Sequence, residues 1–530
     1  MATPANLRSR RSAAQLHALA GVEREIRAQD SHNRRKYLRE FNQAFRSYES
    51  LLDSDQIQQA LHPADIVLVG DYHALPAAQR CAATLLEQRA LAGDRPVVLG
   101  VETIFARDQH ILDEWWRREI DESELRQRIR FDLDWGYDWA PFRDLLVAAR
   151  DHAEGLYGLD CMPREDLRKI GARDRHAAAK IAEIRERHPN AVIFVLFGES
   201  HLAPGHLPRA VSEQMPGAKT VTVLQNIDVL YWRAAGERAD KVEGVRINDD
   251  AICVFNATPL EKYESYRLFL DQWSRCEEVP DYAPTIYNLI DSLASFLEIN
   301  RYSPHNGTQP KFLVDMLPEV YGKSSGATLR GLLSRKGLDE EFRESMLAAV
   351  EARGEAYLPQ VNAFYVREFQ MAHAAEDAAR FLHHACQGLP RRLNGHASLS
   401  ENEIGERKTT DEFHALVVEH AVAYFGSRVL HPVRPTADEN DSPQLSRAAL
   451  EKAAHSASRA EQEKVESVAQ EWGYRIGSRI YDAYLAGKVA PSGLRRLFLA
   501  HLDEPGMARK VCAAVIAKLR MAARRAAGAS

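Results

Sequence analysis

The stretch Asp65-Ile-Val-Leu-Val-Gly-Asp-Tyr-His73 decides the fold. Its apolar run lacks the polar alternation of a half-exposed strand, so it predicts a strand that is buried on both faces of a parallel sheet. Four similar runs follow, at Pro96–Val101, Gly155–Leu159, Ala191–Phe197 and Thr220–Leu224. Segments with helical patterns lie between them, at Ala77–Leu91, Gln109–Ile120, Phe142–His152 and Arg173–Arg187. This alternation predicts an α/β fold, with an open, mostly parallel sheet and flanking helices.

The chain on either side of this region is predicted to be mainly helical. Before it, apolar residues recur at helical spacing from Tyr37 to Leu52. After it, Cys253–Asn256 ends a candidate edge strand, and helical patterns dominate the rest. The predicted organisation is an N-terminal amphipathic helical segment (1–55), an α/β domain (56–235) and a mainly α-helical C-terminal region (236–530). The last region is open to a division into two subdomains near residues 433–444, a proline-flanked acidic stretch.

Composition excludes several classes of protein. The net charge of −6 over 530 residues gives no general attraction for nucleic acid. The six cysteines are widely spaced without a CxxC pair, which argues against a zinc ribbon and a disulfide framework. No run of about 18 apolar residues occurs, so no transmembrane segment is expected. The basic N-terminus is not followed by an apolar stretch, so we expect a cytoplasmic protein.

Ionisable side chains stand at the carboxyl ends of four of the predicted strands. The first strand runs into Asp71 and His73, the second into Glu102, the third into Asp160, and the fourth into Glu199 and His201. In an open parallel sheet, ligands bind outside the carboxyl ends of the strands, where loops and helix N-termini converge. We therefore expect these side chains to line one crevice.

The sequence Gly-x-x-His occurs after both the first and the fourth strand, as Gly70–His73 and Gly198–His201. One such motif has little meaning, but two that each follow an apolar strand, with Glu102 at the end of a third, are unlikely to arise by chance. Imidazoles and a carboxylate suit a transition metal. They also suit acid–base chemistry, in which one imidazole is the general base and a carboxylate orients it.

These segments resemble the ChaN branch of the Tiki/TraB/erythromycin-esterase superfamily. The resemblance rests on Val67–His73, Gly100–Glu102, Gln109–Asp113, Trp135–Arg150 and Gly158–Asp160, and it continues through Phe197–Gly205. Members of the ChaN family are haem-binding proteins of iron uptake, while relatives include Tiki-type metalloproteases and erythromycin esterases. The resemblance implies a metal set of His73, His201 and Glu102, or an acid–base role for the same residues in a hydrolase.

Two departures from the family pattern bear on these expectations. Asp71 stands where the superfamily commonly has glutamate, and its shorter side chain withdraws the carboxylate by about one methylene. We expect neither a signal peptide nor a lipidation cysteine at the N-terminus, so the lipoprotein character of ChaN is not expected to apply.

The leading hypothesis is a cytoplasmic ChaN-like protein that binds haem or a divalent transition metal ion at the strand ends. Asp71, Tyr72, Tyr137, Asp160 and Glu199 are the further candidates for ligand binding, and a tyrosine phenolate is one possible axial ligand of haem. The alternatives are a metal-assisted or His/Glu-dependent hydrolase of an ester or amide, and a binding module with a decayed site. In the leading hypothesis the helical C-terminal region covers the site, forms a homo-oligomer or recruits a protein partner. In the decayed module the helical region carries the function.

Histidines also occur in the C-terminal half, and we expect most of them to be ordinary, partly buried side chains. They lie with acidic neighbours on two predicted helices, as His373, Glu376, His383 and His384 and as His414, Glu419 and His420. Neither segment supplies the Glu-x-x-His pattern of a di-iron bundle.

Overall fold

The computed structural model describes residues 4–29, 36–161, 170–238, 242–275, 279–300, 313–322, 326–335, 340–387, 392–393, 396–397, 409–434, 445–457, 462–502 and 504–527. The chain divides into two compact units. We call Glu23–Arg275 the sheet unit, and Met1–Val22 together with Cys276–Ser530 the helical unit. The segment 433–444, predicted as a linker, falls largely outside the described residues.

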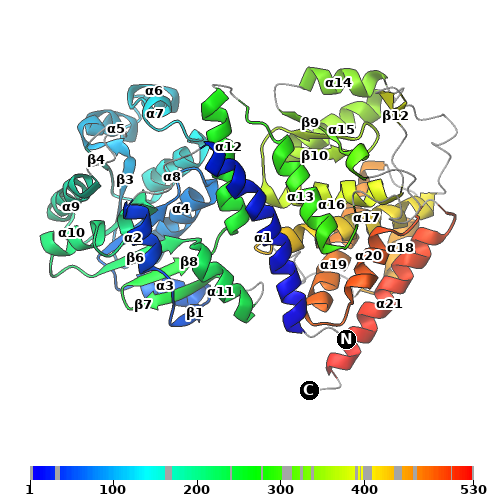
Figure 1. Ribbon diagram of the computed structural model, residues 1–530. Coiled ribbons are helices and arrows are strands. Elements are labelled where there is room, and N and C mark those ends of the chain that lie inside the picture. The colour runs from blue at the N-terminus through cyan, green and yellow to red at the C-terminus, as the bar shows by residue number, and fades with distance from the viewer. Residues whose placement is uncertain are drawn as a thin grey trace. The chain divides into compact units, whose positions relative to one another are not determined.

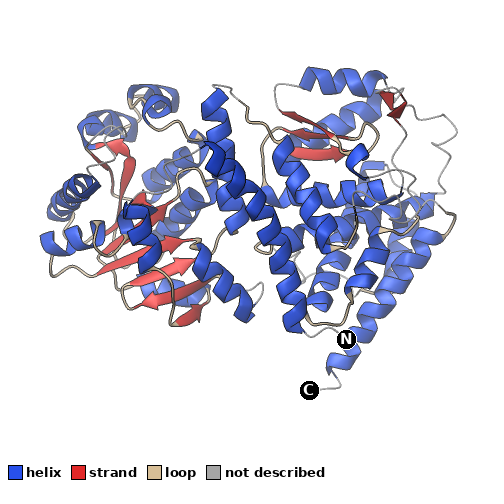
Figure 2. Cartoon of the chain, viewed as in Figure 1, coloured by secondary structure: helices blue, strands red, loops and turns tan. Residues whose placement is uncertain are grey.

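The sheet unit contains an eight-stranded sheet within its described residues, and Figure 2 shows it in red. Its strands are β1 (Ser50–Leu52), β2 (Ile66–Asp71), β3 (Val97–Phe105), β4 (Gly155–Asp160), β5 (Val192–Gly198), β6 (Thr220–Gln225), β7 (Gly244–Asn248) and β8 (Ala251–Val254). They lie in the order β1-β7-β8-β6-β2-β5-β3-β4. From β8 to β4 all neighbours are parallel, while β7 and β1 pair antiparallel. The predicted α/β class with a mostly parallel sheet is confirmed.

Helices cover both faces of this sheet (Figure 1). From residue 36 onward, the helices of the sheet unit are α2 (Lys36–Ala44), α3 (Ser54–Leu61), α4 (Pro76–Leu91), η1 (Ala106–Asp108), α5 (Gln109–Trp116), α6 (Glu122–Arg128), α7 (Phe131–Asp134), α8 (Trp139–His152), α9 (Ile170–Arg187), η3 (Glu199–Leu202), α10 (Leu207–Gln214), α11 (Asp228–Arg238) and α12 (Pro259–Arg275). Successive residues of β2 enter opposite cores. Val67 and Val69 pack in the core of α3 to α8, whereas Ile66 and Leu68 pack in the core of α2 and α9 to α11. Burial on both faces explains why the strands read as unbroken apolar runs.

Two local predictions are wrong. The helix expected from Tyr37 to Leu52 ends at Ala44, and Ser50–Leu52 form β1, which pairs with β7. The strand at Cys253 is not an edge strand, because β8 lies between β6 and β7. Both differences come from the antiparallel strand β7, whose sequence pattern did not indicate a strand.

The described part of the helical unit is mainly α-helical, as expected. Its elements are α1 (Pro4–Gln29, of which residues up to Val22 belong to this unit), α13 (Ala283–Phe296), η4 (Leu313–Met316), β9 (Glu319–Gly322), α14 (Gly326–Arg335), α15 (Glu340–Arg353), β10 (Glu355–Leu358), β11 (Ala363–Val366), α16 (Met371–Gln387), β12 (Arg392–Leu393), β13 (His396–Ala397), α17 (Thr409–Leu430), α18 (Arg447–Ala457), α19 (Gln462–Leu485), α20 (Pro491–Phe498) and α21 (Met507–Ala527). Within the described ranges, each helix is too short or too polar to span a bilayer.

The strand order fixes where the predicted site lies. Because β2, β5, β3 and β4 are consecutive parallel neighbours, their carboxyl ends form a row at one edge of the sheet. Asp71 lies opposite Gly198 in the pairing of β2 with β5. The register of β3 against β4 shifts after Val101, immediately before Glu102. Such an irregularity re-aims the side chains that follow it.

Candidate functional site

The carboxyl end of β2 holds an aspartate–histidine pair. Asp71 Oδ2 lies 2.7 Å from His73 Nδ1, and the Gln79 amide donates to the other Asp71 oxygen. Since a carboxylate oxygen acts as the acceptor in such a contact, we assign a proton to Nδ1 of His73. The rings of Trp135 and Tyr137 each lie 5.3 Å from the His73 ring. His73 is thus oriented by a carboxylate and bordered by aromatic rings.

Glu102, on β3, is bound to a buried arginine from α9. Arg173 Nη2 donates to Glu102 Oε1 at 2.5 Å, and the same guanidinium donates to Asp160 through Nε at 3.0 Å and Nη2 at 2.7 Å. The backbone N–H of Gly198 donates to the second Glu102 oxygen. Burial raises the pKa of Glu102, but Arg173 and the two site histidines outweigh it and lower the pKa to about 2. Glu102 is therefore an ionised carboxylate at neutral pH.

A second aspartate–histidine pair lies on the far side of Glu102. His201 Nδ1 lies 2.5 Å from Asp174 Oδ1, and the other Asp174 oxygen lies 3.1 Å from His206 Nδ1. His201 Nε2 lies 3.4 Å from Arg173 Nη1. Because a guanidinium can only donate, Nε2 of His201 acts as the acceptor in this contact.

The two histidines and Glu102 converge on Gly198. An ideal Cβ at this glycine would lie 3.0 Å from Glu102 Oε2, 3.4 Å from His73 Nε2 and 3.6 Å from His201 Cδ2. The glycine therefore leaves the space into which three strand ends direct their side chains. The structure brings together Asp71, His73, Glu102, Asp160 and His201 of the predicted residues, with Tyr137 beside His73.

Glu199 and Tyr72 belong to an adjacent group. Lys262 Nζ, from α12, lies 3.0 Å from both oxygens of Glu199 and 4.7 Å from the centre of the Tyr72 ring. Burial raises the pKa of Glu199 although Lys262 opposes the rise. Burial also raises the pKa of Tyr72 well above its usual value, and Tyr263 and Glu199 add to the effect. Tyr72 is therefore a neutral phenol.

Sequence reasoning missed Arg173 and Asp174, which hold Glu102 and His201. A signal was present, because both residues precede the apolar residues Ala177 and Ala178 by one helical turn. Residues four apart share a helix face. Arg173 and Asp174 are therefore charged residues on the apolar face of this helix. Because the preceding strand ends in the carboxylate Asp160, they indicate a buried ionic network.

The lowered pKa of Glu102 predicts that the sheet unit loses stability in acid. Its pKa is depressed from 4.5 to about 2 in the folded protein, so its stabilising contribution is complete above pH 4.5 and is lost as the pH falls towards 2. Between pH 6 and pH 3, wild type is expected to lose about 2 kcal/mol more than Glu102→Gln. Urea unfolding followed by tryptophan fluorescence measures this difference, since six of the seven tryptophans lie in the sheet unit. Equal losses in the two proteins would contradict the proposed ionisation of Glu102.

The acidic residues of the helical unit are paired mainly with arginines. Glu376 lies 2.6 Å from Arg434 and 3.1 Å from Arg353, and Glu419 lies 2.7 Å from Arg380. Burial lowers the pKa of His420 to about 4. These contacts form an ionic network inside the helical unit.

A divalent metal site is not supported at the strand ends. Among the residues that the structure describes, no three His, Cys, Asp or Glu side chains form a group that could hold a metal ion. The physical reason is that Arg173 and the Gly198 N–H already occupy both oxygens of Glu102. The positive charge of Arg173 also opposes a second cation at this carboxylate.

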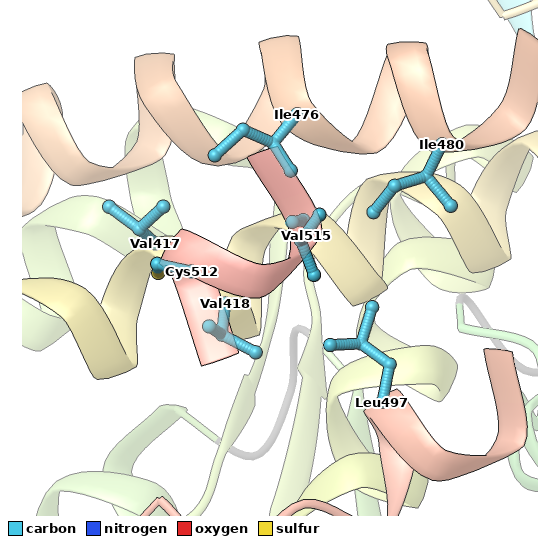
Figure 3. A pocket seen from close by; sticks show the side chains of 8 residues that line it. Val417, Val418, Ile476, Ile480, Leu497, Cys512 and Val515 are labelled. Carbon is cyan, nitrogen blue, oxygen red and sulfur yellow. The ribbon is translucent and has the colours of Figure 1, made fainter. Parts of the chain in front are cut away.

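Figure 3 shows a small cavity in the helical unit, enclosed by α17, α19, α20 and α21. It is lined by Val417, Val418, Ala421, Ile476, Ile480, Leu497, Cys512 and Val515. Its volume of about 10 Å³ is close to the limit for one water molecule, and its lining offers almost no polar partner. We interpret it as a packing defect between helices.

A family model supports the predicted resemblance over part of the chain. No curated protein sequence matches the chain. The chain is similar to a solved structure described as cofacial heme binding to ChaN of Campylobacter jejuni, with 13% identity, coverage of 33% of this chain and 86% of that chain, and a TM-score of 0.26. Residues 57–180, which carry Asp71, His73, Glu102 and Arg173, match the family described as haem-binding uptake, Tiki superfamily, ChaN, so the predicted resemblance is confirmed for this segment.

Proposed function

We propose that the sheet unit binds haem at the carboxyl end of its strands and that His73 coordinates the iron. The observation that carries the proposal is the Asp71–His73 pair beside Trp135 and Tyr137, within the segment that matches a haem-binding family. An iron-ligating histidine commonly donates its second ring N–H to a carboxylate, which fixes the ring and raises its basicity. A histidine that is held by a carboxylate and bordered by aromatic rings therefore has the chemistry to bind haem.

His73 is a better candidate for the iron ligand than the other predicted residues. Its side chain is 14% exposed, compared with 5% for His201. Tyr72 would have to ionise to act as a phenolate ligand, and its raised pKa opposes that. Tyr137 lies against the ring of His73, where its ring suits contact with the porphyrin.

The surrounding residues would have distinct roles towards a bound haem. Haem would supply an iron centre whose behaviour depends on the axial ligand, nearby hydrogen bonds and burial. Asp71 would orient His73 and strengthen its donation. Arg173 would keep Glu102 ionised, which places a fixed negative charge 3.6 Å from His73 Nε2.

Absorption spectroscopy of the full-length protein with haemin tests this proposal. We expect a saturable Soret shift in wild type and in His62→Ala, a matched control whose side chain is 67% exposed. His62 follows α3, before β2 begins, and so lies at the opposite edge of the sheet from His73. A linear, unsaturable change in wild type would contradict a specific haem site.

Replacing Asp71 with asparagine tests the role assigned to the carboxylate. The change keeps the size of the side chain but removes the charge that holds His73 Nδ1. We expect haemin affinity to fall by about 10- to 100-fold, as for other partners of metal-bound histidines. The same titration measures this loss, and an affinity equal to that of wild type would exclude Asp71 from the site.

A His/Glu-dependent hydrolase is the alternative, and the Asp174–His201 pair is the observation in its favour. In that mechanism His201 would accept a proton from water while Asp174 stabilises the imidazolium. Arg173 opposes this role, because its N–H points at Nε2 of His201. This is the ring nitrogen that would have to accept the proton, and a guanidinium can only donate to it. We therefore favour haem binding. Hydrolysis of ester or amide substrates that disappears in His201→Ala, with folding retained, would reverse this order.

A further inference from the structure

The helix α12 places a row of aromatic side chains next to the proposed haem site. Tyr266, Phe269 and Trp273 are spaced three and four residues apart, so they share one face of the helix. The Phe269 ring lies 4.4 Å from the Tyr137 ring, and the Tyr266 ring lies 6.1 Å from the Tyr72 ring. Because Tyr137 also contacts His73, aromatic contacts run from His73 to α12.

This row reaches the protein surface at Trp273. The Trp273 ring lies 6.0 Å from the Phe269 ring, and its residue is 57% exposed. It lies against Gly136, where an added Cβ would come within 2.5 Å of the indole. Gly136 has a φ of +67°, a conformation that glycine adopts without strain. Gly136 thus both turns the backbone before Tyr137 and leaves space for the indole.

The two halves of α12 are held differently. Near its start, Lys262 forms the buried ion pair with Glu199, and Tyr263 donates to Asp228 at 2.6 Å. Near its end, the contacts to the site are aromatic rings. Ring contacts lack the strict directionality of hydrogen bonds, so they can adjust to a planar ligand while the polar contacts hold the helix in place.

We propose that α12 forms a wall of the haem site, with Phe269 and Trp273 in contact with the porphyrin. The inference rests on the proposed haem binding at His73, and it extends the site beyond residues 57–180 to a helix outside the matched segment. Aromatic faces stack well on a planar macrocycle, and an indole that is more than half exposed has area left to bury. A porphyrin that occupied this position would be bordered by Trp135 and Tyr137 near the iron and by α12 further out.

Haemin titrations of Trp273→Ala, Phe269→Ala and Leu91→Ala test the inference. We expect each of the first two to weaken haemin binding by about three- to tenfold, the range for the loss of one aromatic contact. Trp273→Phe, which keeps a ring, should stay closer to wild type. Leu91→Ala should match wild type, because Leu91 is 75% exposed and ends α4, away from the carboxyl ends of the strands. Soret circular dichroism provides a second readout, since it depends on aromatic rings near the porphyrin.

The outcomes separate this inference from the proposed function. If wild type binds haemin and both alanine variants bind it equally well, the proposal that α12 contacts the porphyrin is wrong. The proposed haem site at His73 is then unaffected. If wild type does not bind haemin, both proposals fail. If Phe269→Ala does not fold, as judged by far-ultraviolet circular dichroism, the exposed Trp273 decides the question alone.

Discussion

Arg173→Met is expected to destabilise the sheet unit by about 3–5 kcal/mol, the usual cost of removing one partner from a buried ionic network. The guanidinium donates to both Glu102 and Asp160, and all three residues are at most 4% exposed. Methionine approximates the length of the arginine stem but leaves two carboxylates buried without their cation. Taking up protons would relieve the charge, but Glu102 would then lose the ionised state that Arg173 maintains.

The measurement is urea unfolding of the full-length protein at pH 7, followed by tryptophan fluorescence. Arg175→Met is the matched control, because Arg175 is exposed on the same helix two residues away. We expect the control to change the free energy of unfolding by less than about 0.5 kcal/mol, as is usual for surface substitutions. A loss below about 1 kcal/mol in Arg173→Met would mean that Glu102 and Asp160 do not depend on this arginine.

His73→Ala is expected to weaken haemin binding by at least about 100-fold. Loss of a partner behind a metal-bound histidine costs about 10- to 100-fold, so loss of the ligand itself should cost at least the upper value. The alanine also leaves a space of imidazole size beside Trp135 and Tyr137. Free imidazole is therefore expected to restore the Soret shift in this variant.

His201→Ala and His62→Ala serve as controls for this prediction. His201 contacts Asp174 and Arg173, so its loss should alter stability more than haemin affinity. If haemin affinity falls in His201→Ala and persists in His73→Ala, the proposal that His73 is the iron ligand is wrong. Failure of imidazole to restore binding would indicate that His73 acts through folding and does not coordinate iron.

The sequence predicts the parallel part of the sheet well, because a strand buried on both faces needs an unbroken apolar run. All five runs became strands, from β2 to β6. The two antiparallel strands at one edge of the sheet, β1 and β7, were not predicted, for a related reason. β1 has one buried, one intermediate and one exposed residue, and β7 turns polar towards its end, so neither carries the apolar signal.

The candidate site is partly readable from the sequence for a topological reason. Parallel strands end at the same edge of a sheet, so the alternation of strands and helices is enough to predict that His73, Glu102 and His201 lie near one another. Their partners were harder to predict. Arg173 and Lys262 reach the site from helices whose position depends on tertiary packing, and Lys262 lies 63 residues from Glu199. The position of Arg173 on the apolar face of α9 indicates that it is buried, but local sequence patterns do not encode which residues Arg173 and Lys262 contact.

Several predictions concern features that the geometry of the strand-end site does not test. The boundaries at residues 55 and 235, the cytoplasmic location and the expected partner or homo-oligomer through the C-terminal region stay predictions. The ionic network around Glu376 shows that the helical unit has a polar interior of its own. Its arginine pairs are compatible with a structural role in the bundle.

The most direct test of the account is the position of iron in crystals of the full-length protein grown with haemin, located by anomalous scattering at the iron absorption edge. We predict a single strong peak about 2 Å from His73 Nε2, the usual length of a metal–imidazole bond, with the porphyrin bordered by Trp135 and Tyr137. A peak on another residue, or on the helical unit, would contradict the proposal that the strand ends of the sheet unit bind haem through His73.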